Sequence, residues 1–182
     1  RFFNCGQACL AIKRLYLFDS IADDFTERLV ARVKKLKVGH GLAAGTIVGP
    51  LHSSSQRDEI ESQVQDAVDR GARVLTGGGR LRGDGFDSGH FFAPTLLADV
   101  PEDARVASEE VFGPALPIFR VGSLDEAIEK ANDSIFGLGS SIWTNDLNRA
   151  TRAAERIEAG YTWINSAQII YDELPFGGFQ QS

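Results

Sequence analysis

Two cysteines near the start of the sequence, Cys5 and Cys9, carry the side chains best suited to covalent chemistry. The reactive form of a cysteine is the thiolate, which unpaired backbone N–H groups and positive charge favour. Residues 7–12 can begin a helix, and Cys9 would then lie in its first turn. The same N–H groups would stabilise an oxyanion formed by attack on a carbonyl. Spacing alone leaves two interpretations open for Cys9: a nucleophile, or a small buried apolar residue.

The other candidate groups carry weaker signals. The C-x-x-x-C spacing of Cys5 and Cys9 is typical of neither a zinc site nor a redox motif, and no second cysteine pair exists. We therefore predict no metal, and we interpret Cys5 as a structural neighbour, with a regulatory disulfide as the alternative. His40, His52 and His90 are candidates for a base that activates a thiol. No pattern links them to Cys9, so exposed loop histidines are the alternative.

Composition excludes several classes of protein. The chain has 182 residues, with 19 Lys and Arg against 25 Asp and Glu, and a formal net charge of −6. Nucleic-acid binding requires a basic surface, so we expect no nucleic-acid partner. No apolar run approaches the ~20 residues of a membrane span, so we expect no membrane partner. Two cysteines and no signal peptide favour a reducing compartment, and we predict a cytoplasmic protein.

Helix and strand signals alternate along the chain. Runs of β-branched and aromatic residues predict strands over residues 14–18, 73–76, 91–97, 115–121, 140–144 and 161–164. Helical spacing of apolar residues predicts helices over residues 19–37, 53–70, 123–136 and 145–159. Strands separated by helices of this length favour parallel pairing with right-handed crossovers. The predicted fold class is α/β, with an open, mostly parallel sheet flanked by helices.

Local signals set the boundaries of these elements. Side chains that can cap a helix stand at each predicted start: Asp19 or Ser20, one of Ser53 to Ser55, Ser123, and Asn145 or Asp146. Ser123 and Glu126 also match a capping box. Pro94 suggests that the strand over residues 91–97 lies at a sheet edge. No linker divides the chain, so we expect one domain over residues 1–182.

Three segments resemble, in order, motifs of the aldehyde dehydrogenase superfamily. The first, residues 3–9, resembles the cysteine signature F-x-N-x-G-Q-x-C, with Phe2 or Phe3 as the leading aromatic residue. Residues 109–114 are similar to E-E-[IV]-F-G-P and begin 100 residues after Cys9. Residues 175–182 resemble P-F-G-G-x-x-x-S, and Trp163-Ile164-Asn165 resembles the strand end W-[VI]-N. The resemblance covers essentially the whole chain.

This resemblance implies an enzyme that oxidises an aldehyde to a carboxylic acid with NAD or NADP. Cys9 would be the nucleophile, forming a thiohemiacetal and then a thioester, and its N–H would contribute to the oxyanion hole. Glu110 would accept hydrogen bonds from the nicotinamide ribose, and Phe112 would pack against the nicotinamide. Water would hydrolyse the thioester, or coenzyme A would intercept it.

The resemblance also implies where the aldehyde binds. Ala8 and Leu10 flank the nucleophile, and Ile169, Ile170 and Phe176 occupy the segment that lines the aldehyde tunnel in the family. These side chains suggest a largely apolar pocket for a small-molecule aldehyde. That segment contains no arginine, which disfavours a dicarboxylic semialdehyde.

Members of this family also have a Rossmann-like cofactor domain before the cysteine segment and a C-terminal tail that pairs subunits. We expect residues 1–182 to be the catalytic domain of such an enzyme, without those two parts. The parent would be a homodimer or homotetramer, and the chain alone would be inactive. Two alternatives stay open: a cofactor-free thiol hydrolase that uses Cys9 with a histidine, and a non-catalytic module for subunit contacts.

Overall fold

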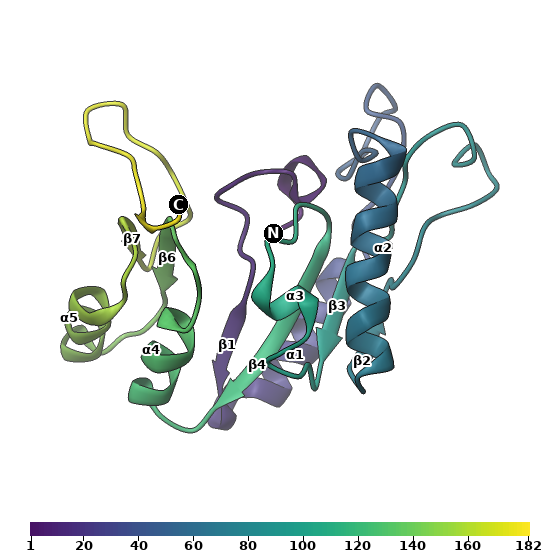
Figure 1. Ribbon diagram of the computed structural model, residues 1–182. Helices are drawn as coiled ribbons and strands as arrows, with labels where there is room; N and C mark the ends of the chain where they lie inside the picture. Colours follow the sequence, from purple (N-terminus) through teal and green to yellow (C-terminus); the bar gives the residue numbers. More distant parts are fainter. The chain divides into compact units, whose positions relative to one another are not determined.

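A four-stranded sheet organises the first part of the chain, with the strand order β1-β4-β3-β2 (Figure 1). The computed structural model describes all 182 residues. The strands of this sheet are β1 (Leu15–Phe18), β2 (Arg73–Thr76), β3 (Thr95–Ala98) and β4 (Ala115–Val121). β3 pairs with β4 in parallel, and β2 pairs with β3 antiparallel. The sheet is therefore mixed, and the predicted α/β class is confirmed.

Helices cover both faces of this sheet. On β3, Leu97 packs with Ile60 and Val64 of α2 (Ser54–Asp69), and the short α3 (Arg105–Ser108) adds to the same core cluster. Leu96 belongs to a second cluster with Ala22 of α1 (Asp19–Val33). Adjacent strand residues point to opposite faces, so neighbouring leucines in β3 reach the two cores. Both leucines are fully buried.

Two local predictions for this sheet were wrong. Neither Asp19 nor Ser20 caps α1, because β1 runs directly into the helix and Phe18 takes the N-cap position without a side-chain cap. Asp19 lies in the first turn and accepts a hydrogen bond from Arg120 Nε at 3.0 Å. Pro94 does not mark an edge, since it precedes β3 and β3 lies between β4 and β2.

The chain divides into two compact units, Arg1–Arg120 and Val121–Ser182, where the sequence led us to expect one domain. The second unit contains two small sheets and two helices. Its elements are α4 (Leu124–Asn132), β5 (Phe136–Gly137), β6 (Gly139–Ile142), α5 (Leu147–Arg156), β7 (Tyr161–Ile164) and β8 (Phe179–Gln180). β6 pairs with β7 in parallel, and β5 pairs with β8 antiparallel. None of the helices in the chain combines the length and apolar character that crossing a membrane requires.

The predicted caps of the second unit are confirmed. Ser123 Oγ accepts a hydrogen bond from Glu126 N at 3.1 Å, and Asp146 Oδ1 accepts one from Arg149 N at 3.1 Å. The Glu126 carboxylate accepts from Gly122 N at 2.8 Å, one residue before the N-cap. α4 ends at Asn132 rather than near Gly137, because Gly137 pairs with Phe179 in the sheet of β5 and β8.

Candidate active site

The turn that carries Cys9 is not the start of a helix, so that prediction was wrong. Residues Phe3–Gly6 form a short 3-10 turn, and Cys9 follows in irregular backbone. Asn4, Cys5 and Gly6 have φ angles of 48°, 57° and 74°. Residues in this left-handed region cannot belong to a right-handed helix, and residues 8–11 then form a single turn in which Ala11 N donates to Ala8 O at 3.0 Å. Cys9 is exposed, and positive charge near its sulfur has to come from a side chain rather than from a helix end.

Gly6 brings the first motif against the second. A Cβ atom on Gly6 would overlap the carbonyl group of Gly113, which belongs to the segment Glu109-Glu110-Val111-Phe112-Gly113-Pro114. Its positive φ also favours glycine. The two motifs therefore touch through their backbones, and only a residue without a side chain fits at position 6.

Gln7 fixes the same turn from its other side. Its Oε1 accepts a hydrogen bond from His52 N at 2.7 Å, and its Nε2 donates to Asn4 O at 3.1 Å. Asn4 Nδ2 donates in turn to Gln7 O at 3.0 Å. These bonds give Asn4 and Gln7 structural roles that the sequence reasoning did not assign. A side-chain amide suits this position because it both donates and accepts.

Arg1 joins the cysteine turn to the second motif, and the sequence reasoning missed it. Its guanidinium donates to Ile12 O at 3.0 Å, to Val111 O at 2.8 Å and to Gly113 O. Burial lowers the pKa of Arg1 to about 10, and the charge of Glu110 opposes that shift. Arg1 keeps its positive charge at neutral pH, and its planar group bonds backbone from both motifs at once.

Lys13 is the second basic residue that the sequence reasoning missed. Its Nζ donates to Ala8 O at 3.1 Å, lies 3.4 Å from Glu110 Oε1, and lies 4.9 Å from the centre of the Phe112 ring. Burial, together with the charge of Arg1, lowers the pKa of Lys13 to about 8, while Glu110 and Cys9 oppose the shift. Lys13 thus places a cation in the electrostatic field of the Cys9 thiol. The only signal in the sequence was a lysine four residues after the cysteine.

Glu110 and Phe112, which the resemblance assigns to the nicotinamide half of the cofactor, lie together around Lys13. Glu110 is exposed, and one of its carboxylate oxygens faces Lys13. The Phe112 carbonyl accepts a hydrogen bond from Gln56 Nε2 of α2 at 3.2 Å. The structure therefore brings together Cys9, Glu110 and Phe112, three of the residues that we predicted for the site, in one unit of the chain.

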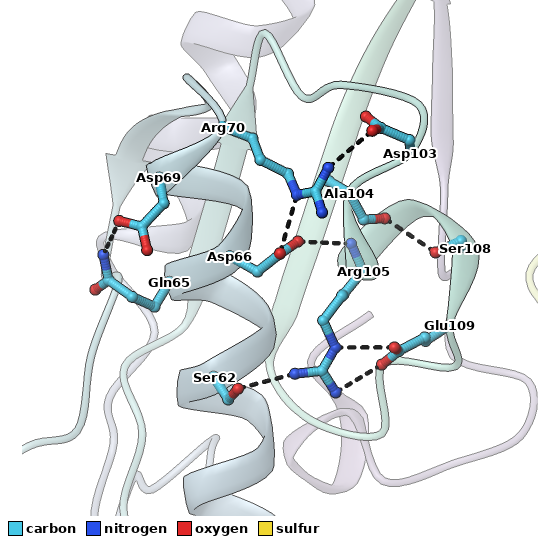
Figure 2. A network of polar contacts seen from close by, with 10 residues as sticks. All are labelled: Ser62, Gln65, Asp66, Asp69, Arg70, Asp103, Ala104, Arg105, Ser108 and Glu109. Carbon is cyan, nitrogen blue, oxygen red and sulfur yellow. Dashed lines mark hydrogen bonds and ion pairs between the residues drawn. The ribbon is translucent and has the colours of Figure 1, made fainter.

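A polar network holds the residue before Glu110. Arg105 donates to both carboxylate oxygens of Glu109, at 2.8 and 2.9 Å, and Gln63 of α2 donates to the same carboxylate at 3.1 Å. Figure 2 shows the Arg105 guanidinium between Glu109 and Ser62, and the guanidinium donates a hydrogen bond to Ser62 Oγ at 2.8 Å. Arg105 lowers the pKa of the Glu109 carboxyl through these hydrogen bonds. The start of the second motif is therefore bonded to α2.

The predicted pocket residues lie in both units. Ala8 and Leu10 flank Cys9 in the first unit and are half-buried. Ile169, Ile170 and Phe176 lie in the second unit and are exposed there. Within that unit, Trp163 Nε1 donates to Ile169 O at 2.9 Å, and the rings of Phe176 and Tyr161 are 5.9 Å apart. Trp163, of the predicted W-[VI]-N strand end, thus fixes the segment that carries these side chains.

The remaining candidates are not part of this cluster. Cys5 is buried, and burial raises the pKa of its thiol to about 12, so Cys5 remains a protonated thiol at neutral pH. Neither cysteine is in a disulfide. His40 Nδ1 accepts a hydrogen bond from Leu42 N at 3.3 Å, within its own loop. His52 reaches the cysteine turn through its backbone N–H to Gln7.

Comparison with known proteins agrees with the packing of these motifs. The model of the aldehyde dehydrogenase family matches residues 1–182. A succinate-semialdehyde dehydrogenase of Mycobacterium avium, named for NADP(+), is 45% identical over 179 residues, which cover 98% of this chain and 37% of that protein. A glutarate-semialdehyde dehydrogenase of Pseudomonas putida is 42% identical over 182 residues, covering 100% of this chain and 37% of that protein.

Solved structures match the fold. The crystal structure of betaine aldehyde dehydrogenase from Staphylococcus aureus in complex with NAD+ is 38% identical, with a TM-score of 0.95. The match covers 99% of this chain and 36% of that one. The chain thus spans about 37% of the length of the curated relatives described above. A family model that matches every residue of the chain shows its family: the chain belongs to the aldehyde dehydrogenase family.

Proposed function

We propose that the complete protein is an aldehyde dehydrogenase that uses NAD or NADP, and that residues 1–182 are its thiol-bearing catalytic domain. The observation that carries the proposal is the packing of the Cys9 turn against the Glu110 segment, through Gly6 and Gly113 and through Lys13. This arrangement puts an exposed thiol in the same cluster as the residues that the family resemblance assigns to the nicotinamide. Without such neighbours, the structure would have favoured the other interpretation of Cys9, a cysteine with no role in catalysis.

The residues present fit the nicotinamide half of the cofactor. The exposed Glu110 carboxylate has oxygens that can accept hydrogen bonds from two ribose hydroxyls, and Phe112 presents an aromatic ring beside it. When bound, the nicotinamide supplies the acceptor for a hydride. Lys13 fixes the carboxylate and the ring relative to the Ala8 carbonyl, directly before the nucleophile.

The proposed chemistry centres on Cys9. Its thiolate adds to the aldehyde carbon, a C–S bond forms, and the carbonyl π electrons move to the oxygen to give a thiohemiacetal. The backbone N–H of Cys9 stabilises that oxygen. Loss of hydride from the same carbon leaves a thioester on Cys9. Water then adds to the thioester carbon and breaks the C–S bond, which releases the carboxylic acid and restores the thiol.

The substrate is an aldehyde, and the named relatives and the residues of this chain point to different classes of it. The two relatives described above are named for succinate semialdehyde and glutarate semialdehyde, and the structural neighbour for betaine aldehyde. The absence of arginine from residues 169–176 favours a neutral or cationic aldehyde. A panel that contains these three compounds and a neutral aliphatic aldehyde distinguishes the possibilities.

The test is reduction of NAD+ and of NADP+ by the complete protein over that panel, with Cys9→Ala and Cys5→Ala in parallel. We expect reduction with at least one aldehyde, its loss in Cys9→Ala, and its retention in Cys5→Ala. Reduction that survives in Cys9→Ala would overturn the proposal. Cleavage of an ester or amide that requires a histidine and no nucleotide would instead support the thiol hydrolase. An acyl-coenzyme A product on addition of coenzyme A would identify an acylating member.

Two further predictions belong to this proposal. The 182 residues alone should not reduce NAD(P)+, because the resemblance assigns the adenosine site and the general-base Glu to segments that have no counterpart among them. The complete protein should be a homodimer or homotetramer in the cytoplasm. Sedimentation of the complete protein and a reduction assay of the 182-residue chain check the assembly and the inactivity.

A further inference from the structure

The Lys13 ammonium contacts both motifs of the candidate site. Its Nζ donates to Ala8 O at 3.1 Å, and Ala8 directly precedes Cys9. The same nitrogen lies 3.4 Å from Glu110 Oε1 and 4.9 Å from the centre of the Phe112 ring. We propose that Lys13 is a positioning residue that holds the nucleophile's turn, Glu110 and Phe112 in one fixed arrangement. The inference rests on the proposed function for the roles of Cys9 and Glu110.

An ammonium group is well suited to this set of partners. It has three donor hydrogens and no acceptor, so it can bond a carbonyl and a carboxylate at the same time and face an aromatic ring. The Lys13 side chain is only 22% exposed, so these interactions are screened less than those of a surface lysine. An uncharged side chain of similar length would fill the space but would leave the Ala8 carbonyl without this donor.

The positioning by Lys13 should depend on pH, because the charge of Lys13 does. Arg1 is the like charge close to it, and Glu110 and the Cys9 thiol are its negative or ionisable neighbours. Burial lowers the pKa of Lys13 to about 8. Below that pH the ammonium carries the charge that faces Glu110 and bonds Ala8 O beside Cys9, and above it the charge is lost. Arginine at this position would stay charged throughout.

The experiment compares Lys13→Met and Lys13→Arg with the unchanged complete protein. The first readout is the pH profile of Cys9 alkylation by iodoacetamide, without aldehyde or nucleotide. In Lys13→Met, the rate at pH 7 should fall about three- to tenfold, because the Ala8 carbonyl loses its donor and the turn that carries Cys9 is no longer held in place. Lys13→Arg should retain most of the rate. Lys37→Met is the matched control, since Lys37 Nζ also donates to a backbone carbonyl, that of Ala44 at 2.7 Å, within a separate loop.

The second readout separates positioning from general stability. In Lys13→Met, KM for NAD(P)+ should rise about fivefold, the effect of one lost hydrogen bond, while the thermal unfolding midpoint matches that of Lys37→Met. In the unchanged protein, KM for NAD(P)+ should rise above pH 8, and in Lys13→Arg it should not. This last comparison still tests the inference if Lys13→Met does not fold.

An unchanged alkylation profile together with an unchanged KM in folded Lys13→Met would overturn the inference. The same holds if Lys13→Arg loses reactivity as fully as Lys13→Met. Failure of the proposed function gives a different pattern: Cys9→Ala would still reduce NAD(P)+, while the alkylation rate of Lys13→Met would fall as described. The alkylation readout therefore tests Lys13 independently of turnover.

Discussion

Gly6 and Gly113 lie backbone against backbone, although 107 residues separate them in the sequence. The same Gly113 carbonyl accepts a hydrogen bond from Arg1. Two segments that are far apart in the chain are thus joined at a point where a Cβ atom on Gly6 would overlap the backbone of Gly113. This contact explains how a thiol in irregular backbone can have a defined place beside Glu110 and Phe112.

Gly6→Ala should therefore disrupt the site. An added Cβ would overlap the Gly113 carbonyl, and the residue would be held at φ +74°. We expect the free energy of unfolding to fall by about 2–3 kcal/mol, from steric overlap and left-handed strain together. Urea unfolding measures the change. Gly49→Ala is the control, because nothing lies within 4 Å of its added Cβ, and it should change stability by less than about 0.5 kcal/mol. Equal stabilities for the two variants would refute the role of this contact.

In the second unit, Gly160 and Gly177 offer a matched pair. A Cβ on Gly160 would overlap the carbonyl of Gly177, whereas a Cβ on Gly177 would meet nothing within 4 Å. Gly160→Ala should displace the segment that carries Phe176 and lower the free energy of unfolding by about 1–3 kcal/mol. Gly177→Ala should be nearly neutral. Thermal unfolding of both variants checks this, and a destabilised Gly177→Ala beside an unaffected Gly160→Ala would contradict the placement of the segment.

Arg105→Met should loosen the start of the second motif. The substitution removes the two hydrogen bonds from Arg105 to Glu109. Of the partners described above, only Gln63 still donates to that carboxylate. We expect KM for NAD(P)+ in the complete protein to rise about three- to tenfold, because Glu110 follows directly. Arg73→Met, which breaks only the exposed pair with Asp99, should leave KM unchanged. If both variants behave alike, the network drawn in Figure 2 does not position Glu110.

The two cysteines should react very differently with iodoacetamide. Cys9 is exposed, whereas Cys5 is buried and burial raises the pKa of its thiol to about 12. The native protein should therefore take up label at Cys9 and not at Cys5 at pH 8, and denaturant should expose both. Peptide mass spectrometry locates the label. Labelling of Cys5 in the native state would show that the turn is open.

The raised pKa of the Cys5 thiol should also make the stability of the protein depend on pH. The folded state retains the Cys5 proton up to about pH 12, whereas an unfolded thiol loses it near pH 8.5. The unfolded state therefore binds fewer protons between those values, and stability falls as pH rises through that window. Cys5→Ala should lessen this fall, which urea unfolding at pH 8 and pH 10 can measure. An unaltered pH dependence in Cys5→Ala would contradict a buried, protonated thiol.

Much of the fold was predictable because its signals are local. Ser53, Ser123 and Asp146 cap helices through bonds to backbone within three residues, and each was among the caps predicted from position. The strand of residues 115–121 was also predicted at its observed limits, because only Arg120 interrupts its apolar run. The strand pair of β5 and β8 was not predicted, since each of these strands has only two residues and two residues carry no periodic pattern.

The geometry of the site was less predictable because distant contacts set it. Residues 7–12, where a helix start was predicted, contain only a turn, and the left-handed backbone at Asn4 and Cys5 and the contact of Gly6 with Gly113 precede it. Arg1 and Lys13 were missed for the same reason. Their partners at Val111 and Glu110 are about 100 residues away in sequence and adjacent only in the fold.

The most direct test of the account is the search for an acyl group on Cys9. The complete protein is mixed with NAD(P)+ and its preferred aldehyde, quenched in acid within the first turnover, and digested for peptide mass spectrometry. We predict an adduct with the mass of the acyl group on the peptide that contains Cys9, which requires both aldehyde and nucleotide and is absent in Cys9→Ala. Formation of NAD(P)H with no adduct on that peptide, at an undiminished rate in Cys9→Ala, would contradict Cys9 as the nucleophile.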